Sequence, residues 1–507
     1  MENVFNRKRF FNKKLVISCL PYLFVFVVVL PKLLGYGMFV DGVLYATIAR
    51  NLSEGLGQFW QPYYTKTMYP SFFEHPPLAI YIQSILFNLF GDTRWIERTY
   101  TLFTGMLQVL LISQVWKAVT NDEDLIWSAP FLFVITPIVF WTLANNELEN
   151  TLVVFMLLST IFVVHGCKSN KTLATVFCGF IAALFIFLGF LSKGVFAFYP
   201  LIFPFFCYYF LIGSFKKNSI ICQVSLIISL ALMLIFLFSI TDARHFFGIY
   251  FMTQVFKSLS GQREIDYPHF LIFRALLEHI ILPMGICFAL ILINRSIKFL
   301  NYNRNTLLFL LMALSATLPL AISAKNHGWY LMISMPFYAL ALASLCSYYI
   351  LKFQEFCIYN KFGKIFLNSI LFSMILLSII LCIRNFNRTV KNSQYHNDFT
   401  MQGIMPLTNI TASFCPLWFR DKAETWMMIA NLARDYKISL SMNVNHRYRV
   451  YLVNNENACA IPPSCKLFFP MEPKIFAMYD CIADPKTNLD PNQREALLDE
   501  EAQKSEN

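Results

Sequence analysis

The stretch DGVLYATIARNLSEGLGQFWQPYYTKTMYPSFFEHPP (41–77) separates the first long apolar segment from the rest of the chain. It is polar and aromatic and is interrupted by Gly and Pro, so its backbone could not be satisfied in lipid and must lie at a membrane surface. It also carries a dense set of ionisable and hydrogen-bonding side chains: Asp41, Tyr45, Arg50, Glu54, Lys66, Glu74 and His75. We predict that this loop forms half of an active site just beyond one membrane face.

The composition is that of a polytopic membrane protein. The 507 residues are 57% hydrophobic, 17% aromatic and only 14% charged, with a mean hydropathy of +0.53, which is far more apolar than a soluble chain of this length requires. In a soluble protein, the formal net charge of +11 would suggest a nucleic-acid partner. Here the basic residues stand in short runs between apolar segments, where they act as topology signals. We therefore expect membrane lipids and no nucleic acid as partners.

Apolar runs of roughly twenty residues predict about eleven transmembrane helices. The fold class expected is an all-α polytopic membrane protein, with interfacial helices and a small soluble α/β domain at the C-terminus. The run Leu78–Phe90 is short and begins at a Pro-Pro pair, so we interpret it as interfacial or re-entrant. The predicted spans lie near 15–35, 99–119, 127–144, 151–166, 173–191, 195–213, 219–240, 272–293, 306–323, 329–350 and 365–383.

Basic loops indicate the orientation. With a cytoplasmic N-terminus, and with Leu78–Phe90 not crossing, the positive-inside rule is satisfied by the basic loops at 168–171, 216–217, 295–304 and 352–364. An odd number of crossings then exports the chain after about residue 384. We expect a multi-pass protein of a bacterial inner or plasma membrane, with its active site and C-terminal region outside the cytoplasm.

The chain changes character after the last apolar segment. Following a transmembrane domain at 1–385, short strand-like segments and an amphipathic helix pattern at 421–436 predict a small extracytoplasmic α/β domain at 390–483. The polar, acidic tail 484–507 is predicted to be disordered. One or two disulfides can form in the exported region, with three pairings open if all four of its cysteines take part: Cys415, Cys459, Cys465 and Cys481.

Further polar segments fall on the same predicted side as the 41–77 loop. They are the acidic connection NNELEN (145–150), the segment from Asp242 to His269, which we expect to be a long loop, and KNHGWY (325–330). The tripeptide Ser192-Lys193-Gly194 joins the same face. We expect these segments to converge on one site.

Four motifs carry a family resemblance. They are D-x-x-x-Y-A beginning at Asp41, FEHPPL (73–78), LENTL (148–152) and FLSKG (190–194). In this order, and over about the first 350 residues, the sequence resembles the GT-C glycosyltransferases of the protein O-mannosyltransferase and aminoarabinose (lipid A) transferase superfamily. The resemblance implies a GT-C fold for the membrane domain.

The resemblance also implies an activity. Enzymes of this superfamily take a sugar from a polyprenyl-phosphate carrier and attach it, with inversion, to a hydroxyl or phosphate acceptor on a glycolipid such as lipid A or on a protein. Such a transfer needs a carboxylate to remove the acceptor proton and cations to neutralise the departing phosphate. A phosphate leaving group needs no protonation, so a second acid is not obligatory.

The resemblance assigns the two acidic positions. Asp41 matches the family's first catalytic acidic residue and would be the general base. Glu149 matches the second, where it would orient the acceptor or support the base, and Glu147 is the alternative if the register differs by two residues.

Binding of the phosphate is predicted for a further set of residues, which lie in or near family-like motifs: Lys193, His75, Tyr330, Arg50, Tyr45 and Arg263. The family often has Lys where this chain has His75, so either His75 is protonated beside Glu74 or another cation, such as Lys66, takes over. Glu74 and His269 match positions that can approach a metal in the aminoarabinose transferases, so a divalent metal is possible, although the chemistry does not clearly require a cofactor.

The main alternative is a secondary transporter or lipid flippase without transferase activity. Transporters place ionisable residues within membrane segments and show repeated halves with broken helices. Here the predicted spans are almost free of charge at their centres and no repeat is visible, which favours the transferase. The sequence leaves the sugar and the acceptor open.

Overall fold

The computed structural model describes residues 16–35, 37–211, 216–260, 271–293, 304–322, 327–386, 411–414, 422–441, 450–454, 466–470 and 476–480. The chain forms two compact units. The first consists of residues 1–34, 73–86 and 90–386, and the second of residues 35–72, 87–89 and 387–507. The four C-terminal cysteines and the tail 484–507 lie outside the described residues.

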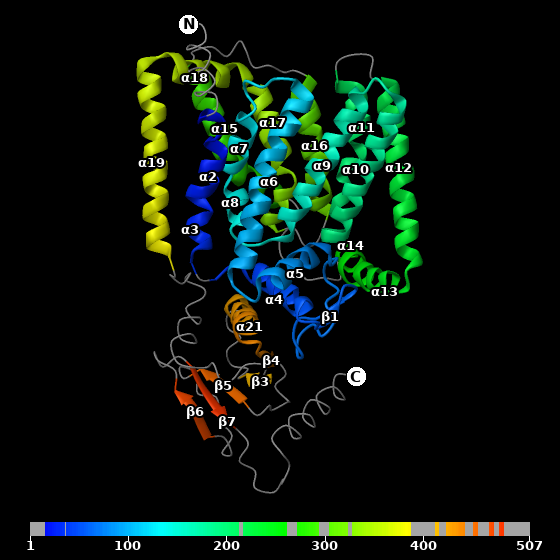
Figure 1. The fold of residues 1–507 in the computed structure, drawn as a ribbon, viewed down its shortest axis with the longest axis vertical. Coiled ribbons are helices and arrows are strands. Elements are labelled where there is room, and N and C mark those ends of the chain that lie inside the picture. Colours follow the sequence, from blue (N-terminus) through cyan, green and yellow to red (C-terminus); the bar gives the residue numbers. More distant parts are fainter. Residues whose placement is uncertain are drawn as a thin grey trace. The chain divides into compact units, whose positions relative to one another are not determined.

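The first unit is a helical bundle (Figure 1). Its helices are α2 (Leu20–Val28), α3 (Leu30–Leu33), most of α5 (Leu78–Phe90), α6 (Trp95–Thr120), α7 (Ser128–Val134), α8 (Pro137–Leu143), α9 (Leu148–Lys168), α10 (Thr172–Lys193), η1 (Gly194–Ile202), α11 (Phe203–Phe210), α12 (Lys216–Ser239), α13 (Thr241–Tyr250), η2 (Phe251–Phe256), α14 (Lys257–Leu259), α15 (Leu271–Ile293), α16 (Arg304–Ile322), η3 (Gly328–Ile333), α17 (Met335–Leu345), α18 (Ser347–Tyr359) and α19 (Lys361–Asn385).

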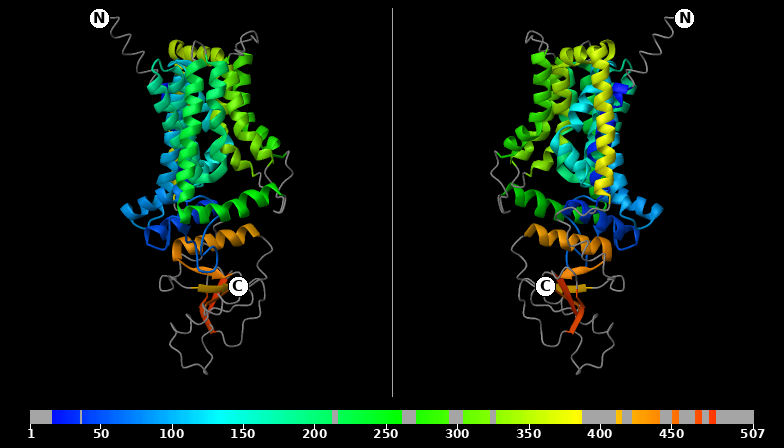
Figure 2. Two further views of the ribbon diagram at one scale, coloured as in Figure 1. Left: turned by 90° about the vertical axis from the view of Figure 1, so that its right-hand side faces the viewer. Right: turned by 90° about the vertical axis from the view of Figure 1, so that its left-hand side faces the viewer.

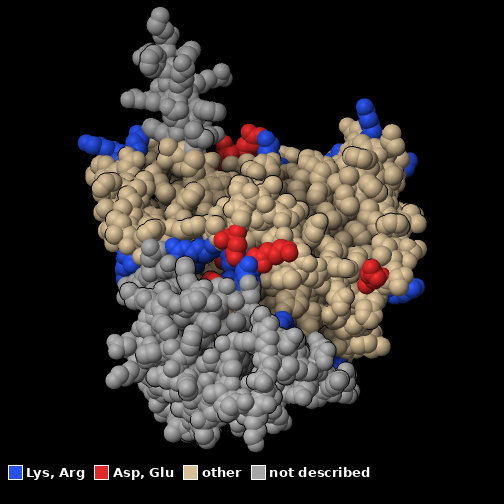
Figure 3. Space-filling model, turned by 60° about the horizontal axis from the view of Figure 1, so that its bottom comes forward, with Lys and Arg blue, Asp and Glu red and all other residues tan. Residues whose placement is uncertain are grey.

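Within the described residues, eight helices are long and apolar enough to cross a membrane, or nine if α17 and α18, bent by 75°, count as one span. This confirms the predicted all-α polytopic fold class, whereas the count of eleven stays a prediction. The predicted span 127–144 is divided into α7 and α8 because Thr136 is extended before Pro137. The predicted spans 173–191 and 195–213 form one continuous apolar stretch, Thr172–Phe210. In Figure 3 most of the described surface carries no charged side chain, and a group of acidic and basic side chains stands together near the middle of the view.

Small residues allow the central helices to approach closely, as is common in membrane bundles. A Cβ added to Gly179 on α10 would meet the Ser225 Cβ of α12 at 2.8 Å, and one added to Gly189 would meet the Leu152 Cδ1 of α9 at 3.0 Å. Helix α10 is therefore packed firmly between α9 and α12. This packing fixes Lys193, the last residue of α10, in the interior.

The segment predicted as a long loop after Asp242 is helical over its described part, so that expectation was wrong. Helix α13, the π-helix η2 and α14 run from Thr241 to Leu259 and lie across one end of the bundle, while α18 lies across the opposite end (Figures 1 and 2). The reason is a short amphipathic repeat: Ala243, Phe246, Phe247 and Tyr250 are all buried, at the spacing of one helix face.

The second unit combines the N-terminal part of the 41–77 loop with the C-terminal segment, whereas the sequence suggested a division near 385–390. It contains α4 (Val40–Ser53), the hairpin β1 (Gly57–Gln58) and β2 (Gln61–Pro62), and α21 (Lys422–Tyr436). Its five-stranded sheet has the order β4-β3-β5-β7-β6; β3 pairs in parallel with β4 and β5, and β7 pairs antiparallel with β5 and β6. The strands are β3 (Thr411–Phe414), β4 (Ser439–Ser441), β5 (Val450–Asn454), β6 (Lys466–Pro470) and β7 (Phe476–Asp480).

Buried hydrogen bonds join the two sequence segments of this unit. The Arg50 side chain, only 2% exposed, donates to the Arg434 carbonyl at 2.5 Å and to the Ala433 carbonyl at 3.1 Å. Within the N-terminal segment, the Asn51 side chain donates to the Tyr64 carbonyl at 2.7 Å. Arg50 thus satisfies carbonyls in the last turn of α21, which have no partner within the helix.

Candidate active site

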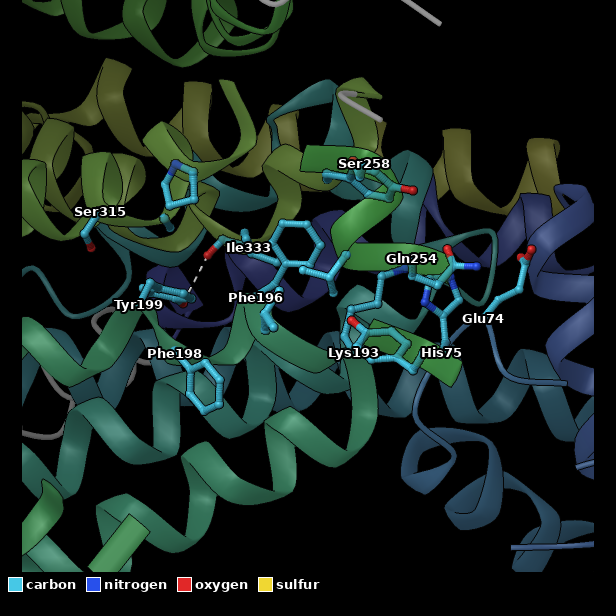
Figure 4. Close-up of a pocket in the computed structure, with 16 residues that line it drawn as sticks. Glu74, His75, Lys193, Phe196, Phe198, Tyr199, Gln254, Ser258, Ser315 and Ile333 are labelled. Carbon is cyan, nitrogen blue, oxygen red and sulfur yellow. Dashed lines mark hydrogen bonds between the residues drawn. The ribbon is translucent and has the colours of Figure 1, made fainter. Parts of the chain in front are cut away.

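A pocket of about 440 Å³ lies within the first unit (Figure 4). Glu74, His75 and Gln254 lie toward one end of it, and Tyr199 and Ser315 toward the other. Aromatic and aliphatic side chains make up most of the remaining lining: Val195, Phe196, Phe198, Tyr250, Val255, Ala316, Pro319, Tyr330 and Ile333, together with Lys193 and Ser258. The pocket therefore has a polar end that continues into an apolar, aromatic end.

Lys193 is the charged centre of the pocket. Its Nζ lies 3.0 Å from Glu149 Oε1, and the two side chains are 3% and 1% exposed. The same ammonium lies 5.3 Å from the centroid of the Tyr330 ring, within the range of a cation–π interaction. Because an unpaired charge is costly to bury, Glu149 stabilises a cation at this depth.

The turn that carries Glu149 is fixed by hydrogen bonds. The Asn150 amide donates to Thr101 Oγ1 and to the Thr142 carbonyl, both at 3.0 Å, and the Asn150 carbonyl accepts from Gln108 at 2.8 Å. Asn146 has a left-handed backbone, with φ of 54°. These bonds hold the first turn of α9, and with it the carboxylate of Glu149, in one position.

The turn that carries Lys193 depends on a glycine. Gly194 has φ of +74°, and a Cβ there would collide with the Tyr250 hydroxyl group. Tyr250 is the last residue of α13 and is 3% exposed. Only glycine therefore allows α10 to end at this point with α13 packed against it.

Polar residues that sequence reasoning missed come from the helices after Tyr250. Gln254 lies on the π-helix η2 and Ser258 on α14, and both line the pocket. Single-turn π-helices are frequent at functional sites. The amphipathic spacing of α13 could have revealed a helix here, but no sequence pattern signals the π-turn that places Gln254.

The structure brings together five of the predicted residues. Glu74, His75, Lys193 and Tyr330 line the pocket, and Glu149 joins them through its ion pair with Lys193. The alternative acidic residue, Glu147, is 2% exposed and precedes the first residue of α9.

The other predicted residues fall into two groups. Asp41, Tyr45 and Arg50 lie on α4 in the second unit, and Arg263 and His269 lie outside the described residues. The Arg50 guanidinium donates to main-chain carbonyls, so the structure gives it a structural role, and its binding of phosphate stays a prediction.

The described part of the chain contains no group of three His, Cys, Asp or Glu side chains that could hold a metal ion. Glu74 lines the pocket, and its predicted partner His269 is outside the described residues. The described residues alone therefore do not form the predicted metal site, and we assign no chemical step to a metal.

Comparisons with known proteins agree with the motifs. A family model described as dolichyl-phosphate-mannose-protein mannosyltransferase matches residues 74–241. No curated protein matches the sequence at a significant level.

Solved structures match nearly the whole chain. ArnT from Cupriavidus metallidurans bound to undecaprenyl phosphate aligns with a TM-score of 0.62 at 12% identity, covering 93% of this chain and 98% of that one. The archaeal oligosaccharyltransferase AglB from Archaeoglobus fulgidus, in complex with an inhibitory peptide and a dolichol-phosphate, aligns with a TM-score of 0.50 at 15% identity, covering 84% and 64%. The resemblance predicted from the motifs is therefore confirmed: the chain has the fold of the GT-C glycosyltransferases and, over residues 74–241, the sequence pattern of the mannosyltransferase family.

Proposed function

We propose that this protein transfers a sugar from a polyprenyl-phosphate carrier to a hydroxyl or phosphate acceptor, with inversion, on the exported face of the membrane. The observation that carries the proposal is the pocket in which the buried Lys193 stands between a polar end and an apolar, aromatic end. A lipid-linked sugar phosphate combines the same two properties, an anionic head and a long apolar chain. The solved ArnT and AglB complexes contain undecaprenyl phosphate and dolichol-phosphate, respectively, which supports the same ligand class here.

Lys193 is the residue that we assign to the leaving phosphate. An ammonium has three N–H donors, so Lys193 can bind a phosphate oxygen while it stays in its ion pair with Glu149, at 3.0 Å. In a water-poor pocket this charge stabilises the negative charge that develops as the bond to the sugar breaks. Glu149 is then a positioning residue, and His75 and Tyr330 complete the phosphate end of the pocket.

Asp41 is the residue that we assign as general base. It lies in the first turn of α4, where the helix dipole favours a carboxylate. In the proposed step Asp41 takes the proton of the acceptor hydroxyl, and the acceptor oxygen attacks the anomeric carbon opposite the phosphate. The carbon–oxygen bond to the phosphate then breaks, and the phosphate leaves with the electron pair, which inverts the anomeric centre.

The test is a transfer assay with the purified full-length protein and radiolabelled polyprenyl-phosphate sugars. We expect wild type to transfer label to a lipid or protein acceptor, and Asp41→Asn and Lys193→Met to lose at least a hundredfold in rate. Asp92→Asn and Lys117→Met make the same chemical changes away from the pocket and should behave as wild type.

The same variants separate the transferase from the transporter or flippase. Transfer by Asp41→Asn at the wild-type rate would remove Asp41 from the mechanism. Carrier translocation by wild type without any sugar transfer, and with Asp41→Asn translocating equally well, would overturn the proposed function.

A further inference from the structure

A second pocket, of about 720 Å³, lies where α15, α18 and α19 meet. We call it the elbow pocket; it is lined by Leu290 and Ile293 of α15, Phe353 and Phe356 of α18, and Phe366 and Ser369 of α19, among others. Helix α18 lies at the end of the bundle opposite α13 and α14 (Figure 1). The elbow pocket is therefore separate from the candidate active site.

The bend between α17 and α18 and the turn into α19 are held by specific contacts at this end of the bundle. Helix α18 turns by 75° from α17 and is anchored by the buried bond from Trp127 Nε1 to Gln354 Oε1, at 2.6 Å. A Cβ at Gly363 would collide with the Phe356 carbonyl, so glycine lets α19 begin directly against α18. Asn360 caps α19 by accepting from the Phe362 backbone N–H at 2.8 Å.

Apolar side chains around the elbow pocket face outward. Ile293 is 74% exposed, and Phe362, which also lines the pocket, is 75% exposed. The most apolar stretch of α19 has no residue buried within the protein. A pocket open to this surface would be filled by the surrounding lipid, because exposed apolar surface on a membrane-spanning helix is in contact with acyl chains. The chemistry of its walls fits a hydrocarbon chain.

One lysine lines the elbow pocket, and two more lie next to lining residues in the sequence. Lys352 lines it and is paired with Glu355 at 2.8 Å, with side chains 45% and 43% exposed. Lys361 and Lys364, at the start of α19, add two further positive charges beside the lining residues Phe362 and Ile365. From Ser347 to Ser369 the chain thus carries three lysines and one glutamate, which gives this part of α18 and α19 a net positive charge.

We propose that the elbow pocket binds an anionic phospholipid of the surrounding membrane. One acyl chain lies between α15 and α19, and the headgroup phosphate lies against Lys352 and Lys361. Basic clusters at the end of a membrane helix attract anionic lipids, and long lysine side chains reach the headgroup level from the helix end. This site is independent of the sugar-transfer chemistry, because it shares no residue with the first pocket.

Native mass spectrometry of the full-length protein tests the proposal. The delipidated protein is titrated with phosphatidylglycerol or with phosphatidylcholine of the same acyl chains. We expect wild type to bind one phosphatidylglycerol at least about fivefold more tightly than phosphatidylcholine. Lys352→Gln with Lys361→Gln should remove this preference, and Lys117→Gln, which changes another exposed, ion-paired lysine, should not.

A steric variant tests the acyl-chain part of the site. Ser369→Phe should weaken the binding of both lipids about tenfold by filling the pocket, whereas Ile383→Phe, near the other end of α19 and 74% exposed, should leave binding unchanged. Three results would overturn the proposal: equal binding of the two lipids by wild type, undiminished binding by Ser369→Phe, or displacement of phosphatidylglycerol by millimolar inorganic phosphate alone. The exposed lysine variants keep the test decisive if Ser369→Phe does not fold.

Discussion

The buried ion pair between Glu149 and Lys193 supports the sharpest prediction. The pair is 3.0 Å apart and both side chains are at most 3% exposed, so its Coulomb attraction is about 5 to 6 kcal/mol at an effective dielectric constant of about 20. Removing one partner leaves a charge buried without compensation. We therefore expect Glu149→Gln and Lys193→Met each to lower the free energy of unfolding by roughly 3 to 5 kcal/mol.

The double variant distinguishes stability from activity. Glu149→Gln combined with Lys193→Met removes both charges of the pair, and such replacements are often close to neutral, so we expect the double variant to be more stable than either single variant. All three variants should nevertheless lose transfer, because the cation that we assign to the phosphate is absent or misplaced.

The assay is a double-mutant cycle measured by unfolding in mixed SDS and detergent micelles, with sugar transfer measured on the same samples. The control cycle uses Lys117 and Glu123, an exposed pair at 2.6 Å with side chains 50% and 68% exposed, whose coupling should not exceed about 1 kcal/mol. If the Glu149 and Lys193 effects on unfolding are additive, the two side chains act independently and the reasoning is refuted.

Three further predictions concern the turns and the second unit. Gly194→Ala should destabilise the protein by about 1 to 3 kcal/mol, because of the positive φ and the clash with the Tyr250 hydroxyl. Adding Tyr250→Phe should recover part of this loss in a thermal-unfolding assay, and no recovery would contradict the assigned contact. Arg50→Ala should speed protease cleavage of the C-terminal segment, because the carbonyls at the end of α21 lose their donors, while a digestion pattern identical to wild type would argue against that anchor. Burial raises the pKa of Tyr64 above its ordinary value of 10.0, so the folded state favours the neutral phenol, and this stabilisation is lost as the pH rises above about 10. The melting temperature of wild type should therefore fall more steeply above that pH than the melting temperature of Tyr64→Phe. Parallel curves of melting temperature against pH would refute the assignment.

Much of the membrane architecture follows from the sequence. Runs of about twenty apolar residues can satisfy their backbone in lipid only as helices, so the helical fold class follows from hydropathy without tertiary information. The motifs also indicated which residues would meet: Glu74, His75, Lys193 and Tyr330 are far apart in the sequence, yet they line one pocket. Their chemical roles stay predictions.

The short helices were harder to predict. The segment from Thr241 to Leu259 contains Asp242, Arg244, His245, Gln254 and Lys257, so its hydropathy resembles that of a loop. Its helical form depends on burying Phe246 and Phe247 against the bundle, which is a tertiary contact.

The sequence by itself thus determined the membrane class, the helical character and the set of polar segments, because these depend on local composition and on the length of lipid that each segment must cross. Only the tertiary structure decided that Lys193 is neutralised by Glu149, that Gly194 lies against Tyr250, and that Gln254 enters the pocket from a π-turn. These are contacts between helices distant in the sequence. Their geometry is set by side-chain packing across the bundle, and the sequence of a single segment contains no pattern that predicts such packing.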